Sequence, residues 1–486
     1  MAANTKAVLN PSKERQRSFQ QLKNSVVKHP YLGIGFGLYW MQTILLFQSP
    51  YLFLDPSPLA FWHLPKGTIL VIASIATYLL WSLLFRKANV VSMAQWFPFV
   101  LTAGLLCGAI LYVIYPAFLA DSPFIATVLY IVGSVLIGCG MANVCLETGR
   151  IFGYLGPRQV LFHGTCALFI GTVGGLLLSL FPPEIGKIAL IATPIPMVTC
   201  LWKSLQNLPR KTLYAQGLTA EVHLPKKFLT MSFFQGLALG VMHGLLINNF
   251  GSSSVVVSIG FMCAIFLLFF CAISLKNNFD MLIFRIGFPL MALGFFLVGT
   301  FSSVFFLGAV LLDAGYGFQY LITCSLCAYL AKGLGQPPIW IIGTGTACLL
   351  IGQFLGSVID LFSPSQDILA VSMAVILLLA ALFMIDNQNI RYGWGAVRPG
   401  SEHIDEADAS ALACQLLASE YELSKRETEV FNLIIKGYNR KSIGKGLCLS
   451  EETIKTHTGN IYQKFLVHSR QELIDLARQR ETTLQQ

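Results

Sequence analysis

The segment 451–465 carries the side chains with the clearest chemistry, because Lys, Thr, His and Asn recur along a stretch with helical spacing. A shorter helix is expected to begin at Asn439, and the turn 448–450 joins the two, with Ser450 placed to cap the second helix. Residues 424–480 hold 11 Lys/Arg against 6 Asp/Glu. Two short helices joined by a tight turn, the second one rich in hydrogen-bonding side chains, are typical of a helix-turn-helix, which contacts nucleic-acid phosphates and bases.

Two further helix starts frame this pair. Ser424 and Glu427 have the spacing of a capping box, in which side chain and backbone N–H groups satisfy one another at the first turn. Ser469 and Glu472 repeat the pattern. The sequence therefore predicts a four-helix, all-α domain over 423–480.

The fixed positions of this segment resemble those of the LuxR-type helix-turn-helix domain of bacterial transcription regulators. The resemblance covers about 55 residues and rests on Leu423, Ser424, Arg426, Glu427, Glu429 and Val430, then Gly437 to Lys441 with Ile443, then Leu449, Ser450, Thr453, Ile454, Lys455, His457, Asn460, Ile461, Tyr462, Lys464 and Phe465, and finally Val467, Ser469 and Arg470.

The resemblance implies that 450–465 lies in or beside the major groove of promoter DNA. Lys455 and Thr456 would face base edges, whereas the other positions would hold the phosphate backbone or support these contacts. The full set expected to bind DNA is Arg440, Lys441, Ser450, Thr453, Lys455, Thr456, His457, Asn460 and Lys464. A homodimer would form through the last helix, with Leu473, Ile474 and Ala477 on its dimer face.

Some positions depart from the pattern. Gly459 lies where a side chain could reach a base, so few direct contacts to base edges are expected. Gly444 and Gly446 lie inside the expected supporting helix, and each costs about 1 kcal/mol relative to Ala.

The rest of the chain has the composition of a membrane protein. Residues 1–386 carry 31 charged side chains, whereas the 100 residues 387–486 carry 26. A secreted protein and a purely soluble enzyme are thereby excluded. Apolar runs long enough to cross a bilayer are expected at 31–49, 67–85, 95–115, 123–147, 159–181, 186–202, 228–250, 254–275, 283–301, 303–330, 338–361 and 367–386.

The basic residues of 1–386, which precede the first run or lie in the loops and at the ends of the runs, fall almost entirely on one side. Eighteen Lys/Arg lie on the side of the N-terminus, and only Lys66 and Lys187 lie on the other. Because Lys and Arg accumulate in cytoplasmic loops, both termini are expected in the cytoplasm of a cell whose inner or plasma membrane holds the chain.

The two groups of six runs repeat one another. The segment 164–171 resembles 345–352, and the same offset of 181 relates Gly175 to Gly356. Two six-helix units in the same orientation resemble the major facilitator superfamily, which implies a twelve-helix bundle with a cavity between its halves. The loop between the second and third runs, 84–90, lacks the glycines and the aspartate of the superfamily's usual signature, which puts transport in doubt.

These patterns divide the chain into consecutive parts. The expected parts are a basic cytoplasmic segment at 1–30, a first six-helix half at 31–202, a basic cytoplasmic loop at 203–227, a second half at 228–386, an acidic linker with a short helix at 387–422, and the DNA-binding domain at 423–480.

Two ionisable residues fall in the middle of apolar runs. His243 and Asp313 are expensive to keep in lipid, so they are candidates for ligand sensing. The alternative is a buried pair that locks two helices together. Cys324 and Cys327 form a CxxC with no second pair, so a metal site is not expected. No cofactor is expected, and an enzyme is not indicated because phosphate-binding loops and nucleophile elbows are missing.

We therefore expect a membrane-embedded one-component transcription regulator, in which the membrane half senses an unknown small molecule and the tail binds promoter DNA and the transcription machinery. The alternative is a facilitator-type transporter with a regulatory DNA-binding tail.

Overall fold

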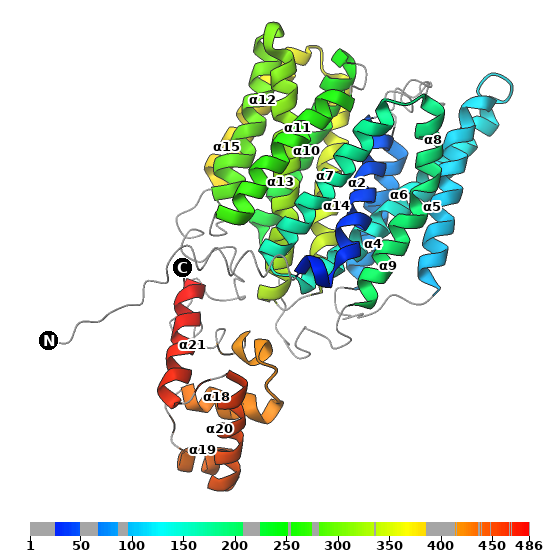
Figure 1. Cartoon of the computed structure of the whole chain (residues 1–486). Helices are drawn as coiled ribbons and strands as arrows, with labels where there is room; N and C mark the ends of the chain where they lie inside the picture. Colours follow the sequence, from blue (N-terminus) through cyan, green and yellow to red (C-terminus); the bar gives the residue numbers. More distant parts are fainter. Residues whose placement is uncertain are drawn as a thin grey trace. The chain divides into compact units, whose positions relative to one another are not determined.

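The structure is a computed structural model. It describes residues 25–48, 67–85, 96–207, 224–250, 254–274, 281–334, 337–384 and 414–485, except for 415, 436–437, 439, 448, 466 and 468. Two compact units are present, one formed by the apolar helices and one by the C-terminal helices (Figure 1). No strand occurs within these ranges.

The apolar helices form an all-α bundle. Its first half contains α2 (Pro30–Gln48), α4 (Thr68–Leu84), α5 (Phe97–Ile114), α6 (Pro123–Tyr154), α7 (Pro157–Ser179), α8 (Pro183–Ala192) and α9 (Pro194–Gln206). Its second half contains α10 (Lys226–Phe250), α11 (Ser254–Ser274), the π-helical η3 (Met281–Gly287), α12 (Phe288–Thr300), α13 (Phe305–Leu334), α14 (Pro338–Phe362) and α15 (Gln366–Met384).

Each of the twelve expected apolar runs coincides with one of these helical segments. The sixth run is divided into α8 and α9 at Pro194, which has no backbone N–H to continue the first helix. Nine helices of the described residues are long and apolar enough to cross a membrane, and two shorter apolar helices lie at Thr68–Leu84 and Val255–Phe270. The chain is thus a multi-pass membrane protein, while the number of twelve crossings stays a prediction.

The internal repeat places the same glycines in the same kind of contact. A Cβ added to Gly171 of α7 would lie 3.0 Å from the backbone nitrogen of Met41 in α2. A Cβ added to the matching Gly352 of α14 would lie 2.8 Å from the backbone nitrogen of Leu237 in α10. Missing side chains let helix backbones approach closely in a membrane, so the repeated glycines build equivalent α2–α7 and α10–α14 pairs.

The C-terminal unit contains α18 (Lys425–Ile435), α19 (Arg440–Leu447), α20 (Glu451–Phe465) and α21 (Arg470–Gln485). Val430 and Phe431 of α18, Ile454 of α20 and Leu473 of α21 meet in one hydrophobic core. Cys414 and residues 416–420 are helical and precede α18, and Leu417 is buried in the same core. The end of the expected linker is therefore packed onto the domain.

Candidate nucleic-acid interface

The helix starts of the C-terminal unit are held by the side chains that the sequence suggested. The backbone N–H of Glu427 donates to Ser424 Oγ over 3.3 Å, and the N–H of Ser424 donates to Glu427 Oε2 over 2.7 Å, which is a reciprocal capping box. At α20, the N–H of Thr453 donates to Ser450 Oγ over 3.1 Å. Ser450 therefore caps the helix that carries most of the predicted DNA-binding residues. The N–H of Glu472 donates to Ser469 Oγ over 3.2 Å, so all three predicted serine caps are confirmed.

Helix α20 has one buried face and one polar face. The buried positions follow helical spacing and are Ile454, Thr458, Ile461 and Phe465. Lys455, Thr456 and Asn460 are exposed, and His457 is half-buried. The Lys455 ammonium lies 2.9 Å from a carboxylate oxygen of Glu452. The two side chains expected to contact bases, Lys455 and Thr456, are thus accessible. Lys455 would lose only a weak surface ion pair with Glu452 on contacting DNA.

The supporting helix α19 contributes a second positive region. Arg440 is exposed at its start, and Lys441 follows it, although the side chain of Lys441 lies outside the described residues. Burial raises the pKa of the Tyr462 hydroxyl, while the charges of Arg440 and Arg470 lower it. Both guanidinium groups therefore lie near Tyr462, close to the end of α20.

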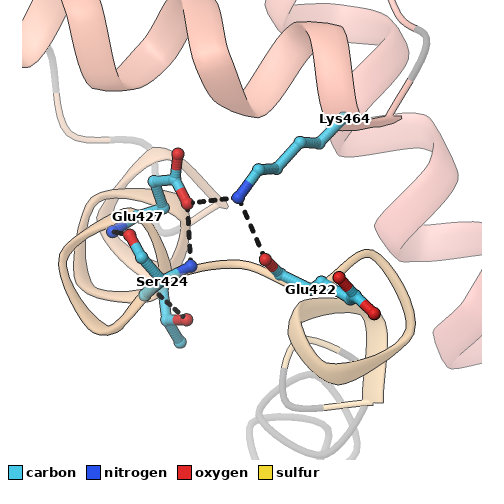
Figure 2. A network of polar contacts seen from close by, with 5 residues as sticks. Glu422, Ser424, Glu427 and Lys464 are labelled. Carbon is cyan, nitrogen blue, oxygen red and sulfur yellow. Dashed lines mark hydrogen bonds and ion pairs between the residues drawn. The ribbon is translucent and has the colours of Figure 1, made fainter. Parts of the chain in front are cut away.

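Lys464 occupies a different place from the other basic residues of α20. Its ammonium donates to Glu427 Oε2 over 2.7 Å and to the backbone oxygen of Glu422 over 3.0 Å, as Figure 2 shows. Glu422 has a φ of 50°, a left-handed conformation that turns its carbonyl into this contact. Lys464 therefore connects the end of α20 to the start of α18, in addition to any contact it makes with a phosphate.

The electrostatics of this network follow from its hydrogen bonds. Burial alone would raise the pKa of the Glu427 carboxyl, but the hydrogen bonds from Lys464 and Ser424 outweigh burial and lower that pKa to about 2. Glu427 is consequently ionised at neutral pH with little contact with solvent. It serves the cap and the ion pair, not proton transfer.

The three residues expected on the dimer face of α21 do not all lie at the surface of the domain. Leu473 and Ala477 are buried in the domain core, whereas Ile474 is half-buried. Arg470, at the start of α21, donates to the backbone oxygens of Ile434 and Tyr438 over 3.3 and 3.0 Å, and so satisfies carbonyls at the end of α18. Sequence reasoning missed this contact, which joins residues more than 30 positions apart.

The two ionisable membrane residues are not joined to each other. His243 lines a cavity between the two halves, and its ring stacks on Phe47 of α2 with centroids 6.1 Å apart. Asp313 is fully buried beside Gly260 of α11 and does not line this cavity. Neither carboxylate oxygen of Asp313 has a hydrogen-bond partner among the described residues.

The model of the bacterial regulatory proteins, luxR family, matches residues 421–477. These residues form a LuxR-type helix-turn-helix domain. Within it, the chain is 42% identical over 52 residues to the transcriptional regulatory protein DegU of Brevibacillus brevis, covering 11% of this chain and 22% of DegU. It is 44% identical over 55 residues to the oxygen regulatory protein NreC of Staphylococcus carnosus, covering 11% of this chain and 25% of NreC.

A third relative, the response regulatory protein YgeK of Escherichia coli K12, is 39% identical over 74 residues, covering 14% of this chain and 50% of YgeK. The chain thus spans between about a fifth and a half of the length of these relatives.

The membrane unit has the fold of major-facilitator-type transporters. It is similar to the human organic anion transporter MFSD10, with a TM-score of 0.53 and 15% identity over 74% of this chain and 99% of that one. It is equally similar to a bacterial homologue of the iron transporter ferroportin, with a TM-score of 0.53 and 13% identity over 74% and 98% of the two chains. The chain therefore joins a LuxR-type DNA-binding domain to a major-facilitator-like membrane domain, and neither of these groups consists of enzymes.

Proposed function

We propose that the chain is a one-component transcription regulator of the cell membrane, in which the membrane unit senses a small molecule and the LuxR-type domain binds promoter DNA. One observation carries the proposal: a single chain joins a LuxR-type domain with an exposed polar face on α20 to a membrane bundle that encloses a cavity. A separate receptor is not needed when sensing and DNA binding share one polypeptide.

In this proposal, Lys455 and Thr456 face base edges in the major groove, because they lie on the exposed face of the first turns of α20. The other residues expected to bind DNA hold the phosphate backbone; they are Arg440, Lys441, Ser450, Thr453, His457 and Asn460. A Cβ at Gly459 would meet nothing within 4 Å, so this position is open and presents no side chain to a base. Backbone contacts then supply most of the affinity.

Sensing is assigned to the membrane unit. His243 lines the cavity, and Asp313 keeps a buried carboxylate whose oxygens have no hydrogen-bond partner among the described residues. Ionisable groups kept at such a position are candidates for a functional role. A ligand can shift the two halves only if it binds one of their arrangements better than the other.

The arrangement in the cell follows from the charge distribution. Both termini lie in the cytoplasm, as the 18 to 2 division of Lys/Arg supports, so the LuxR-type domain reaches DNA and the transcription machinery. A homodimer forms through α21. Because Leu473 and Ala477 are buried in the core, its partner-facing surface is the outer side of the helix, where Ile474 and the exposed Gln471 and Asp475 lie.

The test uses the full chain in lipid nanodiscs and DNA fragments selected from a random pool. The selected fragments should show a footprint and a steep loss of affinity with salt. Lys455→Ala should weaken binding to the selected site by about 10-fold, since a bidentate base contact is worth about 1–3 kcal/mol, and should weaken random DNA less. Arg426→Ala, a matched loss of charge at an exposed position of α18, should leave both affinities unchanged. Selection that enriches no sequence would contradict the proposal.

The second candidate function is transport with a regulatory tail. It is favoured by the fold of the membrane unit, since both solved structures compared above are of transporters or a transporter homologue. Uptake of a ligand into vesicles carrying the chain, at a rate that saturates and is lost in His243→Ala, would support it. A ligand that changes the footprint without any uptake would support sensing instead.

A further inference from the structure

The cavity of the membrane unit is built by both halves of the bundle. It has a volume of about 100 Å³ and is lined from α2, α4 and α6 of the first half and from α10, α11, α13 and α14 of the second. For comparison, an engineered apolar cavity of about 150 Å³ binds benzene. The volume of the cavity is thus close to that needed by one six-membered ring and is too small for a sugar chain or a nucleotide.

Aromatic side chains from both halves form a large part of the cavity wall, beside aliphatic ones. Trp40 of α2 meets Phe261 of α11 edge-on, with centroids 5.7 Å apart and planes at 78°, and it meets Tyr320 of α13 at 5.0 Å and 84°. His243 of α10 stacks on Phe47 of α2. These contacts join the two halves across the cavity, and an aromatic guest makes the same edge and stacking contacts.

The described lining of the cavity has no Lys, Arg, Asp or Glu side chain to balance the charge of an ion. Asp313 is not among the lining residues. An ionised guest would lose its hydration without gaining a counter-charge, which is costly in an apolar enclosure. A carboxylate or a phosphate is therefore disfavoured, and an alkylammonium ion would gain only the attraction of the aromatic faces to offset its lost hydration.

A few polar groups remain to orient a neutral guest. The hydroxyls of Thr43 and Ser74 donate to backbone oxygens of their own helices, at 2.9 Å to Tyr39 and 2.9 Å to Leu70. By contrast, His243 and Gln353 bring an imidazole and an amide to the lining from α10 and α14. These two helices pack so tightly through Gly240 and Gly356 that they hold the two polar groups as one wall.

We infer that the cavity binds an uncharged, single-ring aromatic compound, whose ring packs against Trp40 and Phe47 and whose polar substituent hydrogen-bonds to His243 and Gln353. The inference rests on the proposed function, since it names the ligand class of the sensing site. A guest held in this way touches the first half with its ring and the second half with its polar group. It therefore stabilises the arrangement in which the halves enclose it, which is the differential binding that sensing requires.

The experiment measures binding of three fluorinated probes to the full chain in nanodiscs by ¹⁹F NMR, with empty nanodiscs as the background. The probes share one ring: 4-fluorophenol, which is neutral at pH 7, 4-fluorobenzoate and 4-fluorobenzylammonium. We expect saturable binding of 4-fluorophenol at least 10-fold tighter than that of either ion. Ala142→Phe, which fills the cavity, should abolish this binding.

Gln353→Leu should weaken 4-fluorophenol binding about 5- to 10-fold, because it removes a hydrogen bond while keeping the volume. Gln319→Leu is the matched control, since Gln319 is fully buried in α13 but does not line the cavity, and it should leave binding unchanged. An ion that binds as tightly as the phenol, no saturable binding of the phenol, or binding that survives Ala142→Phe would overturn the inference.

A footprint on the selected DNA, taken with the same nanodiscs and probes, separates the two proposals. If 4-fluorophenol binds in the cavity but leaves the footprint unchanged, the ligand class stands and the sensor proposal fails. If only an ionic probe changes the footprint, the sensor proposal stands and the ligand class fails.

Discussion

Replacing Lys464 by Met separates a structural role of this residue from a role in DNA binding. The substitution keeps most of the side-chain volume but removes the ammonium that contacts Glu427 and the backbone oxygen of Glu422. The Glu427 carboxylate then stays buried, with only the capping hydrogen bond from Ser424 to hold its charge. Removal of one partner of a buried pair is destabilising, because an uncompensated charge remains.

The magnitude follows from the pKa of Glu427, which falls from 4.5 to about 2 on folding. At about 1.4 kcal/mol per pKa unit, this fall corresponds to about 3.5 kcal/mol. That figure is the net effect of the hydrogen bonds and the ion pair of the carboxylate, after the opposing effect of its burial. Lys464 supplies only part of them, and its side chain is 36% exposed, so solvent screens the pair. We therefore expect Lys464→Met to lower the free energy of unfolding by about 1–2 kcal/mol at pH 7.

The pH dependence has a definite sign. A carboxyl whose pKa is lowered by folding contributes stability above its unfolded pKa of 4.5 and loses it as the pH falls toward about 2. The difference between wild type and Lys464→Met should therefore be largest near pH 7 and shrink between pH 4.5 and pH 2. Urea unfolding of the isolated segment 401–486, which has its own hydrophobic core, measures this difference.

Lys455→Met is the matched control, because Lys455 is 61% exposed and its partner Glu452 is 79% exposed. It should change the free energy of unfolding by less than about 0.5 kcal/mol. The reasoning would be refuted if Lys464→Met left stability unchanged at pH 7 but reduced the salt dependence of DNA binding by about one released counterion. That result would show that the ammonium neutralises a phosphate, as the family resemblance implies.

Three further results are expected. Ser450→Ala removes the cap of α20 and should cost about 1 kcal/mol of stability in urea unfolding, which Ser450→Asn should restore. Gly352→Val forces a side chain into the backbone of α10, so the full chain should lose its monodisperse peak in detergent, whereas a change at the open position Gly104→Val should not have this effect. A topology reporter inserted at 187 should report the outside and one fused after 486 the cytoplasm; the reverse pattern would exclude DNA binding by the tail.

Local patterns in the sequence predicted the parts of the structure that depend on neighbouring residues. Apolar runs located the helices because a membrane helix satisfies its own backbone, and the serine caps at 424 and 450 were visible because a capping box spans only four residues. The offset of 181 likewise indicated an internal repeat, and the structure places its glycines in equivalent helix pairs. The apolar runs and the caps can be recognised from neighbouring residues alone, and the repeat can be recognised by comparing two segments of the sequence.

Contacts between distant residues were not visible in the same way. The sequence shows Lys464 as one more basic residue of α20, since its partner Glu427 lies 37 positions earlier. Leu473 has the same apolar character on a dimer face as in a core, and only the packing of α18 against α21 distinguishes the two. His243 and Asp313 looked equivalent as ionisable residues in apolar runs, yet only His243 lines the cavity.

The close pairing of α10 with α14 also constrains how the chain is made. The backbone of α10 packs against α14 along Gly236 and Gly240, but the ribosome finishes α14 at Phe362, 112 residues after the end of α10. At a translation rate of about 5–20 residues per second, these residues take about 6–22 s to make, so α10 is without α14 for that time. During that interval its glycine face is open to lipid or to other helices. The second half of the bundle therefore becomes complete only after α15 has been made, and the LuxR-type domain follows it in translation.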